Sequence, residues 1–246
     1  MDKVYIFDVD GTLTPSRREM TMEFGIFFSL WSMNNTFYLV TGSDIKKTKE
    51  QVPWYILERA DAVFTCCGNE MWINDEHVYR NEFKPPQDLI DFLWDKVNNS
   101  MCPIRIGNHI EDRETMLNFS VVGRDCSQEQ REEYYEWDKK SNERENIAKL
   151  IKENWSDLDA VIGGQISIDI YPKGRDKSQV LEHIEKNHSK GEIIFIGDGI
   201  LNGGNDYPLA KLIEETEKQF GKGEYKWYQT DGYKQTKEIL LEELND

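Results

Sequence analysis

Short apolar runs alternate with amphipathic segments over the first eighty residues of the chain. Apolar runs at residues 4–7, 36–40 and 62–65 have the length of buried strands, and each is followed by glycine or polar positions. The helical spacing of apolar side chains over residues 17–33 predicts a helix, and a second helix is expected over residues 44–56. This alternation of strands and helices is typical of a parallel sheet covered by helices.

The pattern changes at Pro85 and Pro86. Just before them, short apolar runs flank a polar turn at residues 74–76 and predict a hairpin. Beyond them, helices are expected at residues 88–97 and 127–153. The strand-like runs that accompany these helices are residues 103–107, 116–122 and 160–170. Strands and helices grouped in this way predict a separate α+β unit.

The alternating pattern returns after the sequence Pro-Lys-Gly at residues 172–174. The expected elements are a helix at 177–186, a strand at 192–196, a helix at 207–219, a strand at 226–229 and a helix at 232–244. The fold class predicted from the pattern is therefore α/β. Residues 1–82 and 174–246 form the expected catalytic core, and residues 83–173 form an inserted substrate-binding cap.

The charge of the chain narrows the class of partner. Its 46 acidic and 30 basic residues give a formal net charge of −16 over 246 residues. Nucleic acid and anionic membranes would both be repelled by such a surface, so neither is expected as a partner. A small anionic substrate is compatible with this charge, because a local cluster of arginines reverses the local field.

Cysteine usage and hydropathy bear on the compartment. The four cysteines, Cys66, Cys67, Cys102 and Cys126, lack metal-binding spacing. Cys66 and Cys67 lie in an apolar run and are expected to be buried free thiols. The chain opens into a strand rather than a signal peptide, and no apolar stretch is long enough to span a bilayer. A reducing, cytoplasmic location is therefore expected.

Two carboxylates, Asp8 and Asp10, directly follow the first predicted strand. In open α/β sheets, ligands bind at the carboxyl ends of the strands. Neighbouring carboxylates are unfavourable unless a cation or a shared proton neutralises them, and Mg²⁺ suits such oxygen ligands beside a phosphate. The pair predicts phosphoryl transfer, with Asp8 as the nucleophile that forms an aspartyl-phosphate and Asp10 as the general acid and base.

Partners for this pair are expected near other strand ends. The candidates are Thr41 or Ser43 as the hydrogen-bond donor to the phosphoryl group, Lys177 as the partner of Asp8, Asp198 as a further magnesium ligand, and Asn205 and Asp206 as supporting residues. Each of these alone is more often a helix cap or a solvated side chain. Their occurrence together, in this order and at strand ends, favours an active site.

Several motifs resemble those of one known family. The segment FDVDGTLT is similar to the first motif of the haloacid dehalogenase (HAD) superfamily. Within it, the chain closely resembles the eukaryotic-type phosphomannomutases through DVDGTLTPSR at 8–17, GSD at 42–44, MLNFSVVGR at 116–124, GGQISIDIYPKGRDK at 163–177 and GDGILNGGND at 197–206. The resemblance covers most of the chain and implies a Rossmann-like HAD core with a cap of the C2 type.

The resemblance also implies roles for single residues. It makes Asp8 the phosphorylated nucleophile, Asp10 the general acid and base, and Lys177 the core lysine. Asp8, the backbone of Asp10 and Asp198 are the implied magnesium ligands. The implied substrate-binding set is Arg17, Arg113, Arg124, Arg131, Ser167 and Asp169, with Thr41 or Ser43 at the phosphoryl group.

The activity implied by the resemblance is that of a magnesium-dependent isomerase. It would interconvert mannose 6-phosphate and mannose 1-phosphate, with a hexose 1,6-bisphosphate as activator and intermediate, and would serve GDP-mannose biosynthesis. The resemblance further implies a homodimer that forms through the cap. The choice between mannose and glucose stays open at this point.

The cap residues make independent physical sense, because a bisphosphorylated sugar needs a second anion site. Arginine suits this purpose through bidentate contacts, and Ser167 and Asp169 alternate along a strand and so face the same side. The alternative is that the three cap arginines, which are Arg113, Arg124 and Arg131, form surface ion pairs with Glu111, Glu114 and Glu129.

The chain departs from the family pattern at three places. A charged segment surrounds Arg113, Thr41 replaces a usual glycine, and the family's second cation loop is not recognisable after Asp206. Two other functions stay open: a magnesium-dependent phosphatase that transfers the phosphoryl group to water, and a non-catalytic binding protein on the same fold. The histidines are expected at the surface, and the tryptophans in the core or in cap packing.

Overall fold

The computed structural model describes residues 3–188, 191–201, 204–221 and 224–243. The chain divides into two compact units. Residues Met1–Arg80 and Arg175–Asp246 form the first, here called the core unit, and Asn81–Gly174 form the second, here called the cap unit. The α/β class and the Rossmann-like HAD core are confirmed. The assignment of catalysis to the core unit and substrate binding to the cap unit stays a prediction.

The core unit is built on a seven-stranded sheet of order β11-β10-β1-β2-β3-β4-β5. Strands β11 to β3 pair in parallel, and β4 and β5 join as an antiparallel hairpin. The strands are β1 (Lys3–Phe7), β2 (Thr36–Val40), β3 (Ala62–Thr65), β4 (Glu70–Ile73), β5 (Glu76–Arg80), β10 (Glu192–Gly197) and β11 (Tyr225–Gln229).

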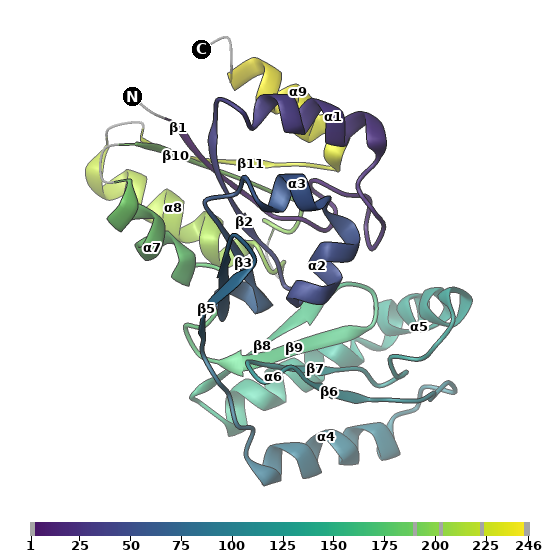
Figure 1. The fold of residues 1–246 in the computed structure, drawn as a ribbon. Coiled ribbons are helices and arrows are strands. Elements are labelled where there is room, and N and C mark those ends of the chain that lie inside the picture. The colour runs from purple at the N-terminus through teal and green to yellow at the C-terminus, as the bar shows by residue number, and fades with distance from the viewer. Residues whose placement is uncertain (1–2, 189–190, 202–203, 222–223, 244–246) are drawn as a thin grey trace. The chain divides into compact units, whose positions relative to one another are not determined.

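Helices cover both faces of this sheet, as Figure 1 shows. They are α1 (Met22–Trp31), α2 (Ile45–Gln51), α3 (Trp54–Leu57), α7 (Gln179–Asn187), α8 (Tyr207–Phe220) and α9 (Tyr233–Glu243), and a short 3₁₀ turn, η1, spans Cys66–Gly68. In β1, Tyr5 and Phe7 pack into the cluster that contains α1 and α9, whereas Val4 and Ile6 pack into the cluster that contains α7 and α8. The period-two alternation of a strand thus separates two apolar cores.

The strand register brings three chain segments to one edge of the sheet. Phe7, the last residue of β1, lies opposite Leu39 of β2 and Ile196 of β10. The residues that follow these strands therefore emerge at the same level. Because the three strands are parallel, the loops that begin at Asp8, Thr41 and Asp198 meet at their carboxyl ends.

The cap unit contains a four-stranded sheet of order β6-β7-β9-β8, in which every pairing is antiparallel. Its elements are β6 (Ile110–Asp112), β7 (Leu117–Phe119), β8 (Leu158–Gly163) and β9 (Ser167–Pro172), with helices α4 (Gln87–Asn99), α5 (Gln128–Ser141) and α6 (Glu143–Asn154). The helices pack on one face, against Leu117, Phe119, Ile168 and Ile170. The side chains that alternate with these apolar residues along the strands point to the opposite face of the sheet.

Several predicted elements have different bounds in the structure. The helix expected over residues 17–33 is shorter, because the Thr21 side chain caps its start by accepting from the Phe24 N–H at 3.4 Å. The helix expected over residues 44–56 is divided into α2 and α3 at Pro53, which has no N–H to continue the ladder.

The cap unit differs from its prediction in the same way. The long polar helix is two helices, α5 and α6, separated by Asn142 in a left-handed conformation with φ of 51°. Asparagine tolerates this conformation better than most residues. The run at residues 160–170 spans parts of two strands, β8 and β9, and the run at 103–107 is not a strand. Among the described residues, no helix is long and apolar enough to cross a membrane.

Candidate active site

Asp8 lies buried directly after β1 and is held by contacts to both of its oxygens. The Lys177 ammonium donates to Oδ1 at 2.6 Å, and the Thr12 hydroxyl donates to Oδ2 at 3.1 Å. Burial raises the pKa of Asp8 well above its usual value, Lys177 opposes this, and Asp206 and Asp198 raise the pKa further. A buried carboxylate with a fixed orientation and one cationic partner suits a nucleophile.

Lys177 is fully buried and bridges two carboxylates. Its Nζ lies 2.6 Å from Asp8 Oδ1 and 2.6 Å from Asp206 Oδ1. Burial lowers the pKa of Lys177, but Asp206 and Asp8 outweigh burial, so the pKa lies above its usual value and the ammonium stays charged. The second oxygen of Asp206 accepts from the Gly199 N–H at 2.8 Å. Asp206 thus ties the lysine to the loop that carries Asp198.

Three carboxylates gather at this point. Oxygens of Asp8, Asp198 and Asp206 all lie within 4.8 Å of one another. Desolvation by the surrounding protein and the carboxylate of Asp206 raise the pKa of Asp198 to about 7. Three carboxylates thus face one ammonium, that of Lys177. The Asp198 carboxylate also packs against Gly11, where a Cβ would meet its Oδ2 at 2.2 Å. A cluster of hard oxygen donors short of positive charge fits Mg²⁺.

Asp10 is oriented by groups outside this cluster. Its Oδ1 accepts from the Gln51 Nε2 at 3.0 Å and from the backbone N–H of Arg17. Arg17 has a φ of 58°, and this left-handed conformation belongs to the loop that wraps around the Asp10 carboxylate. Asp10 is therefore held apart from the pairing of Lys177 with Asp8, in a position of its own within the loop.

Thr41 and Ser43 lie at the carboxyl end of β2 in a tight turn. The buried Thr41 hydroxyl accepts from the Ser43 N–H at 3.1 Å, whereas the Ser43 side chain is half-buried. Cys66 and Cys67 donate their backbone N–H groups to the carbonyls of Ser43 and Thr41 and so hold the turn. The prediction that Cys66 and Cys67 are buried free thiols is confirmed.

The candidate residues of the cap unit form a cluster on the polar face of the small sheet. Glu111 of β6 lies opposite Asn118 of β7, which lies opposite Asp169 of β9. Asn118 donates to Asp169 at 2.5 Å. Burial raises the pKa of Asp169, and this outweighs Arg113, Asn118 and Arg124, which lower it.

The arginines of this cluster are held by hydrogen bonds and ion pairs. Arg124 donates to the Ser167 hydroxyl at 2.9 Å, and Arg131 donates to the Arg124 carbonyl at 3.0 Å. Arg113 and Arg124 both pair with Glu111, at 2.9 and 3.3 Å. Burial lowers the pKa of Arg124. Glu111 therefore does form the ion pairs that were considered as the alternative to phosphate binding. Together with the hydrogen bonds, these pairs bring the guanidinium groups of Arg113, Arg124 and Arg131 near one another.

Sequence reasoning missed three residues that support these sites. Thr12, Gln51 and Asn118 orient Asp8, Asp10 and Asp169, respectively. Asp206, which was expected as a supporting residue, contacts Lys177 directly. Thr12 and Asn118 lie inside the motifs that carry the family resemblance, so their positions in those motifs could have indicated a supporting role. Gln51 lies in α2, and its polar side chain carries no sequence signal for this contact.

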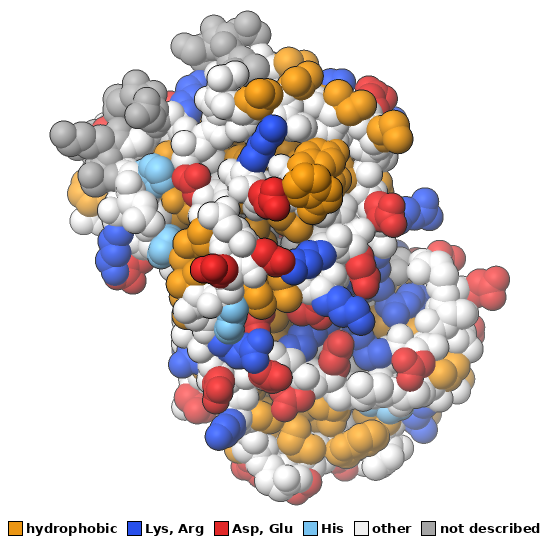
Figure 2. Space-filling model, viewed as in Figure 1, with side chains coloured by type: hydrophobic (Ala, Val, Ile, Leu, Met, Phe, Trp, Pro, Cys, Tyr) orange, Lys and Arg blue, Asp and Glu red, His pale blue; other side chains and the backbone are white. Residues whose placement is uncertain are grey.

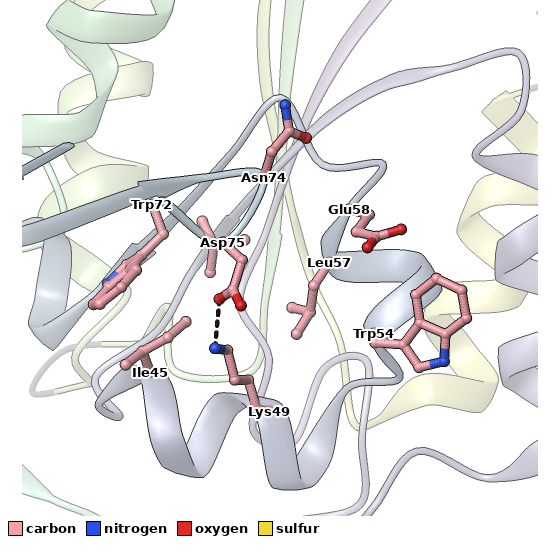
Figure 3. Close-up of a pocket in the computed structure, with 9 residues that line it drawn as sticks. Ile45, Lys49, Trp54, Leu57, Glu58, Trp72, Asn74 and Asp75 are labelled. Atoms are coloured by element: carbon pink, nitrogen blue, oxygen red, sulfur yellow. Dashed lines mark ion pairs between the residues drawn. The ribbon is translucent and has the colours of Figure 1, made fainter. Parts of the chain in front are cut away.

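Among the hollows in the described part of the core unit, two differ in their relation to the candidate site. One of about 720 Å³ borders Gly11, Asp198 and the start of α9 near Tyr233, so it is continuous with the candidate site. The other, about 200 Å³ and shown in Figure 3, has apolar walls that include Ile45 and Trp72 and a Lys49–Asp75 ion pair at its side. None of the candidate catalytic residues lines this second hollow.

Two minor predictions need correction. His109 is buried, because its ring is 2.9 Å from the Ser120 carbonyl and packs against Trp94. Trp54 and Trp227 are more than a third exposed and are thus not core residues. On the visible face of Figure 2, acidic and basic side chains are interspersed rather than gathered into a continuous basic surface.

Comparison with known proteins places these residues in a family. The sequence profile described as eukaryotic phosphomannomutase matches residues 27–239. The chain belongs to the eukaryotic phosphomannomutase family. It is 37% identical to the phosphomannomutase of Encephalitozoon cuniculi over 84% of this chain and 83% of that protein. It is 36% identical to the phosphomannomutase of Dendrobium officinale, over 89% and 87%.

Solved structures show the HAD fold beyond this family. A trehalose-6-phosphate phosphatase domain from C. albicans superimposes with a TM-score of 0.68 at 15% identity, over 97% of this chain and 90% of that one. A haloacid dehalogenase-like hydrolase from Bacteroides thetaiotaomicron gives 0.60 at 15% identity, over 98% and 99%. This chain thus shares its fold with these HAD proteins, and at this identity the likeness concerns the fold alone.

Proposed function

We propose that this protein is a phosphomannomutase, which interconverts mannose 6-phosphate and mannose 1-phosphate. The observation that carries the proposal is the buried Asp8, held by Lys177 at 2.6 Å beside a cluster of carboxylates, in a chain of the phosphomannomutase family. A buried carboxylate that is fixed at a strand end and partnered by a permanent cation is suited to form a phosphoryl ester.

In the first half-reaction, an Asp8 oxygen bonds to phosphorus while the bond from phosphorus to the sugar oxygen breaks. Asp10, in its protonated form, donates its proton to that oxygen. In the second half-reaction a sugar hydroxyl attacks the aspartyl-phosphate, Asp10 takes the hydroxyl proton, and Asp8 is released. Gln51 and the Arg17 backbone hold Asp10 in place for both transfers. Thr41 or Ser43 donates to the phosphoryl oxygens, with Ser43 the more accessible hydroxyl.

Mg²⁺ is the proposed metal. Asp8, Asp198 and the backbone of Asp10 would hold it, and Asp206 would support this set through Lys177 and Gly199. When bound, the ion supplies positive charge to the phosphoryl oxygens. A hexose 1,6-bisphosphate is the proposed activator and intermediate, since each half-reaction leaves or consumes a doubly phosphorylated sugar.

The cap unit is the proposed binding site for the phosphate group that does not react. Arg113, Arg124 and Arg131 supply the positive charge, and Ser167 and Asp169 the contacts to sugar hydroxyls. The support is that contacts and charges link all five side chains, since Arg124 bonds Ser167, Arg131 bonds the Arg124 carbonyl, and Arg113 and Arg124 act on Asp169. Arg17, in the loop after Asp10, is proposed to contact the substrate from the core unit.

A homodimer through the cap and a cytoplasmic location complete the proposal. The cap unit exposes Trp94 and Met101, which are apolar side chains available to an interface. All four cysteines are free, which suits a reducing compartment. Light scattering on the full chain tests the dimer, with Trp94→Glu expected to shift the mass to that of one chain. Fractionation of cells tests the location.

The decisive experiment is a coupled assay of the wild-type enzyme with mannose 1-phosphate or glucose 1-phosphate, Mg²⁺ and hexose 1,6-bisphosphate. Both the isomer and free phosphate are counted. Isomer is expected to form in excess over free phosphate, and Asp8→Asn is expected to lower turnover by about 10⁴-fold or more, as loss of a nucleophile does elsewhere. Release of free phosphate with no isomer would contradict the mutase and favour a phosphatase on the same residues.

A further inference from the structure

Glu111 lies at the edge of the arginine cluster, where a phosphate group is proposed to bind. We propose that Glu111 is an exchangeable counter-anion: it pairs with Arg113 and Arg124 when no phosphate is bound there, and a ligand phosphate displaces it. The inference rests on the proposed function only in taking a phosphorylated sugar as the ligand. It makes Glu111 a residue that sets the affinity of the site without contacting the reacting atoms.

The first support is the contact itself. One oxygen, Glu111 Oε2, accepts from Arg113 Nη2 at 2.9 Å and lies 3.3 Å from Arg124 Nε. A single carboxylate oxygen is thus shared between two guanidinium groups. A phosphate group presents three oxygens to the same donors and makes bidentate, charge-assisted contacts that a shared oxygen does not.

The second support is the difference in burial within the cluster. The Glu111 side chain is 35% exposed, whereas those of Arg113 and Arg124 are 14% and 22% exposed. The carboxylate therefore lies on the solvent side of the arginines. An ion pair with an exposed partner is weak, because water competes for both charges. The carboxylate is the partner that can leave.

The third support is that two of the arginines, Arg124 and Arg131, have anchors other than Glu111. Arg124 is anchored by Ser167, and Arg131 by the Arg124 carbonyl. Asp169, the other carboxylate, is buried and accepts from Asn118, so it is a fixed part of the cluster. Of the two carboxylates, only Glu111 has the exposure that displacement requires.

The fourth support is unused hydrogen-bonding capacity. Arg131 Nη1 is buried, and within the described part of the chain no acceptor reaches it. A buried guanidinium nitrogen without an acceptor is unfavourable. Three arginines against two carboxylates also leave one positive charge unbalanced. An anionic ligand would supply both the missing acceptor and the missing negative charge. Glu111 lowers the affinity for that ligand, because its own negative charge already offsets part of the positive charge of the arginines.

This arrangement has a consequence for turnover. A sugar bisphosphate that reacts at either end must release one phosphate from the arginines and present the other. Release exposes the guanidinium groups, and Glu111 re-forms its pairs with them at once. Glu111 therefore weakens phosphate binding but speeds the exchange of the intermediate. Its removal tightens binding and slows that exchange.

The test measures binding without catalysis. Titration calorimetry with mannose 1-phosphate is run on the full chain with divalent metal chelated, for wild type, Glu111→Gln and Glu111→Asp. Glu133→Gln, which removes an exposed carboxylate from α5, controls for net charge. Glu111→Gln is expected to tighten the dissociation constant about three- to ten-fold, and Glu111→Asp and Glu133→Gln to leave it near the wild-type value. The gain is expected to vanish when Arg124→Lys is added to Glu111→Gln.

Two further readouts separate this role from a structural one. Mannose 6-sulfate carries one negative charge where mannose 6-phosphate carries two, so Glu111→Gln is expected to tighten the phosphate more than the sulfate. In the coupled assay, KM and kcat should both fall. Binding by Glu111→Gln that is weaker than or equal to wild type overturns the inference. If binding tightens but the wild type forms no isomer, the proposed function fails and the inference stands.

Discussion

The two units each gather charged side chains at one place, but with opposite balance. In the core unit one lysine, Lys177, lies among three carboxylates, and it is completely buried. In the cap unit three arginines surround two carboxylates, and the guanidinium groups are partly exposed. We propose that the first arrangement holds a metal cation and orients Asp8 as the nucleophile. The second is proposed to bind an anion and release it, so the difference would separate fixed chemistry from reversible binding.

The largest expected effect comes from breaking the buried core pair. Lys177→Met leaves Asp8 and Asp206 buried without their cation, so the free energy of unfolding is expected to fall by about 3–5 kcal/mol, with loss of activity. Urea unfolding of the variant measures this. Lys186→Met, in α7 and in an exposed pair with Glu182, is the control and is expected to change stability by less than about 0.5 kcal/mol. Equal stability of the two variants would contradict the comparison.

This core pair also shows how far sequence reasoning reaches. The positions of Asp8 and Asp198 follow from local pattern, because apolar runs predict strands and parallel strands share one carboxyl edge. The family and the fold were predicted from motifs and are confirmed. The roles of the single site residues stay predictions.

Other features depend on side-chain geometry that no local pattern encodes. The contact of Lys177 with Asp206 joins two loops, and the two arginines that share Glu111 lie outside the strands β6 and β7. Helix ends were predicted poorly where one residue decides them. Pro53 and Asn142 each divide a helix that the apolar periodicity alone would continue.

A middle-sized effect is expected from the cap arginines. Arg124→Lys keeps the charge but loses the planar fork, so it is expected to raise KM for mannose 1-phosphate about ten-fold. Stability should change little, in contrast to Lys177→Met. Arg59→Lys, an exposed arginine of the core unit that bonds Ser29, controls for the substitution type. An unchanged KM would show that Arg124 only forms ion pairs.

The smallest expected effect is a pH dependence at Asp169. Burial raises its folded-state pKa above the unfolded value, so the folded state binds the proton more tightly. Wild-type stability is therefore lost as pH rises from the unfolded pKa through the folded one. Asp169→Asn has no carboxyl group to lose this proton. Its free energy of unfolding relative to that of the wild type should therefore increase as the pH rises from acidic to neutral. Urea unfolding at several pH values checks this, and a difference that is constant with pH would contradict it.

The pairing of β1 with β10 has a consequence for synthesis of the chain. Lys3 of β1 pairs with Glu192 of β10, and Asp8 bonds Lys177, which is synthesised 169 residues later. At the usual rate of translation, about 5–20 residues per second, the open edge of β1 persists for roughly ten to forty seconds. Unpaired strand edges invite association with other chains. The nascent protein thus passes through an interval in which β1 is paired on one side only and Asp8 lacks its partner Lys177.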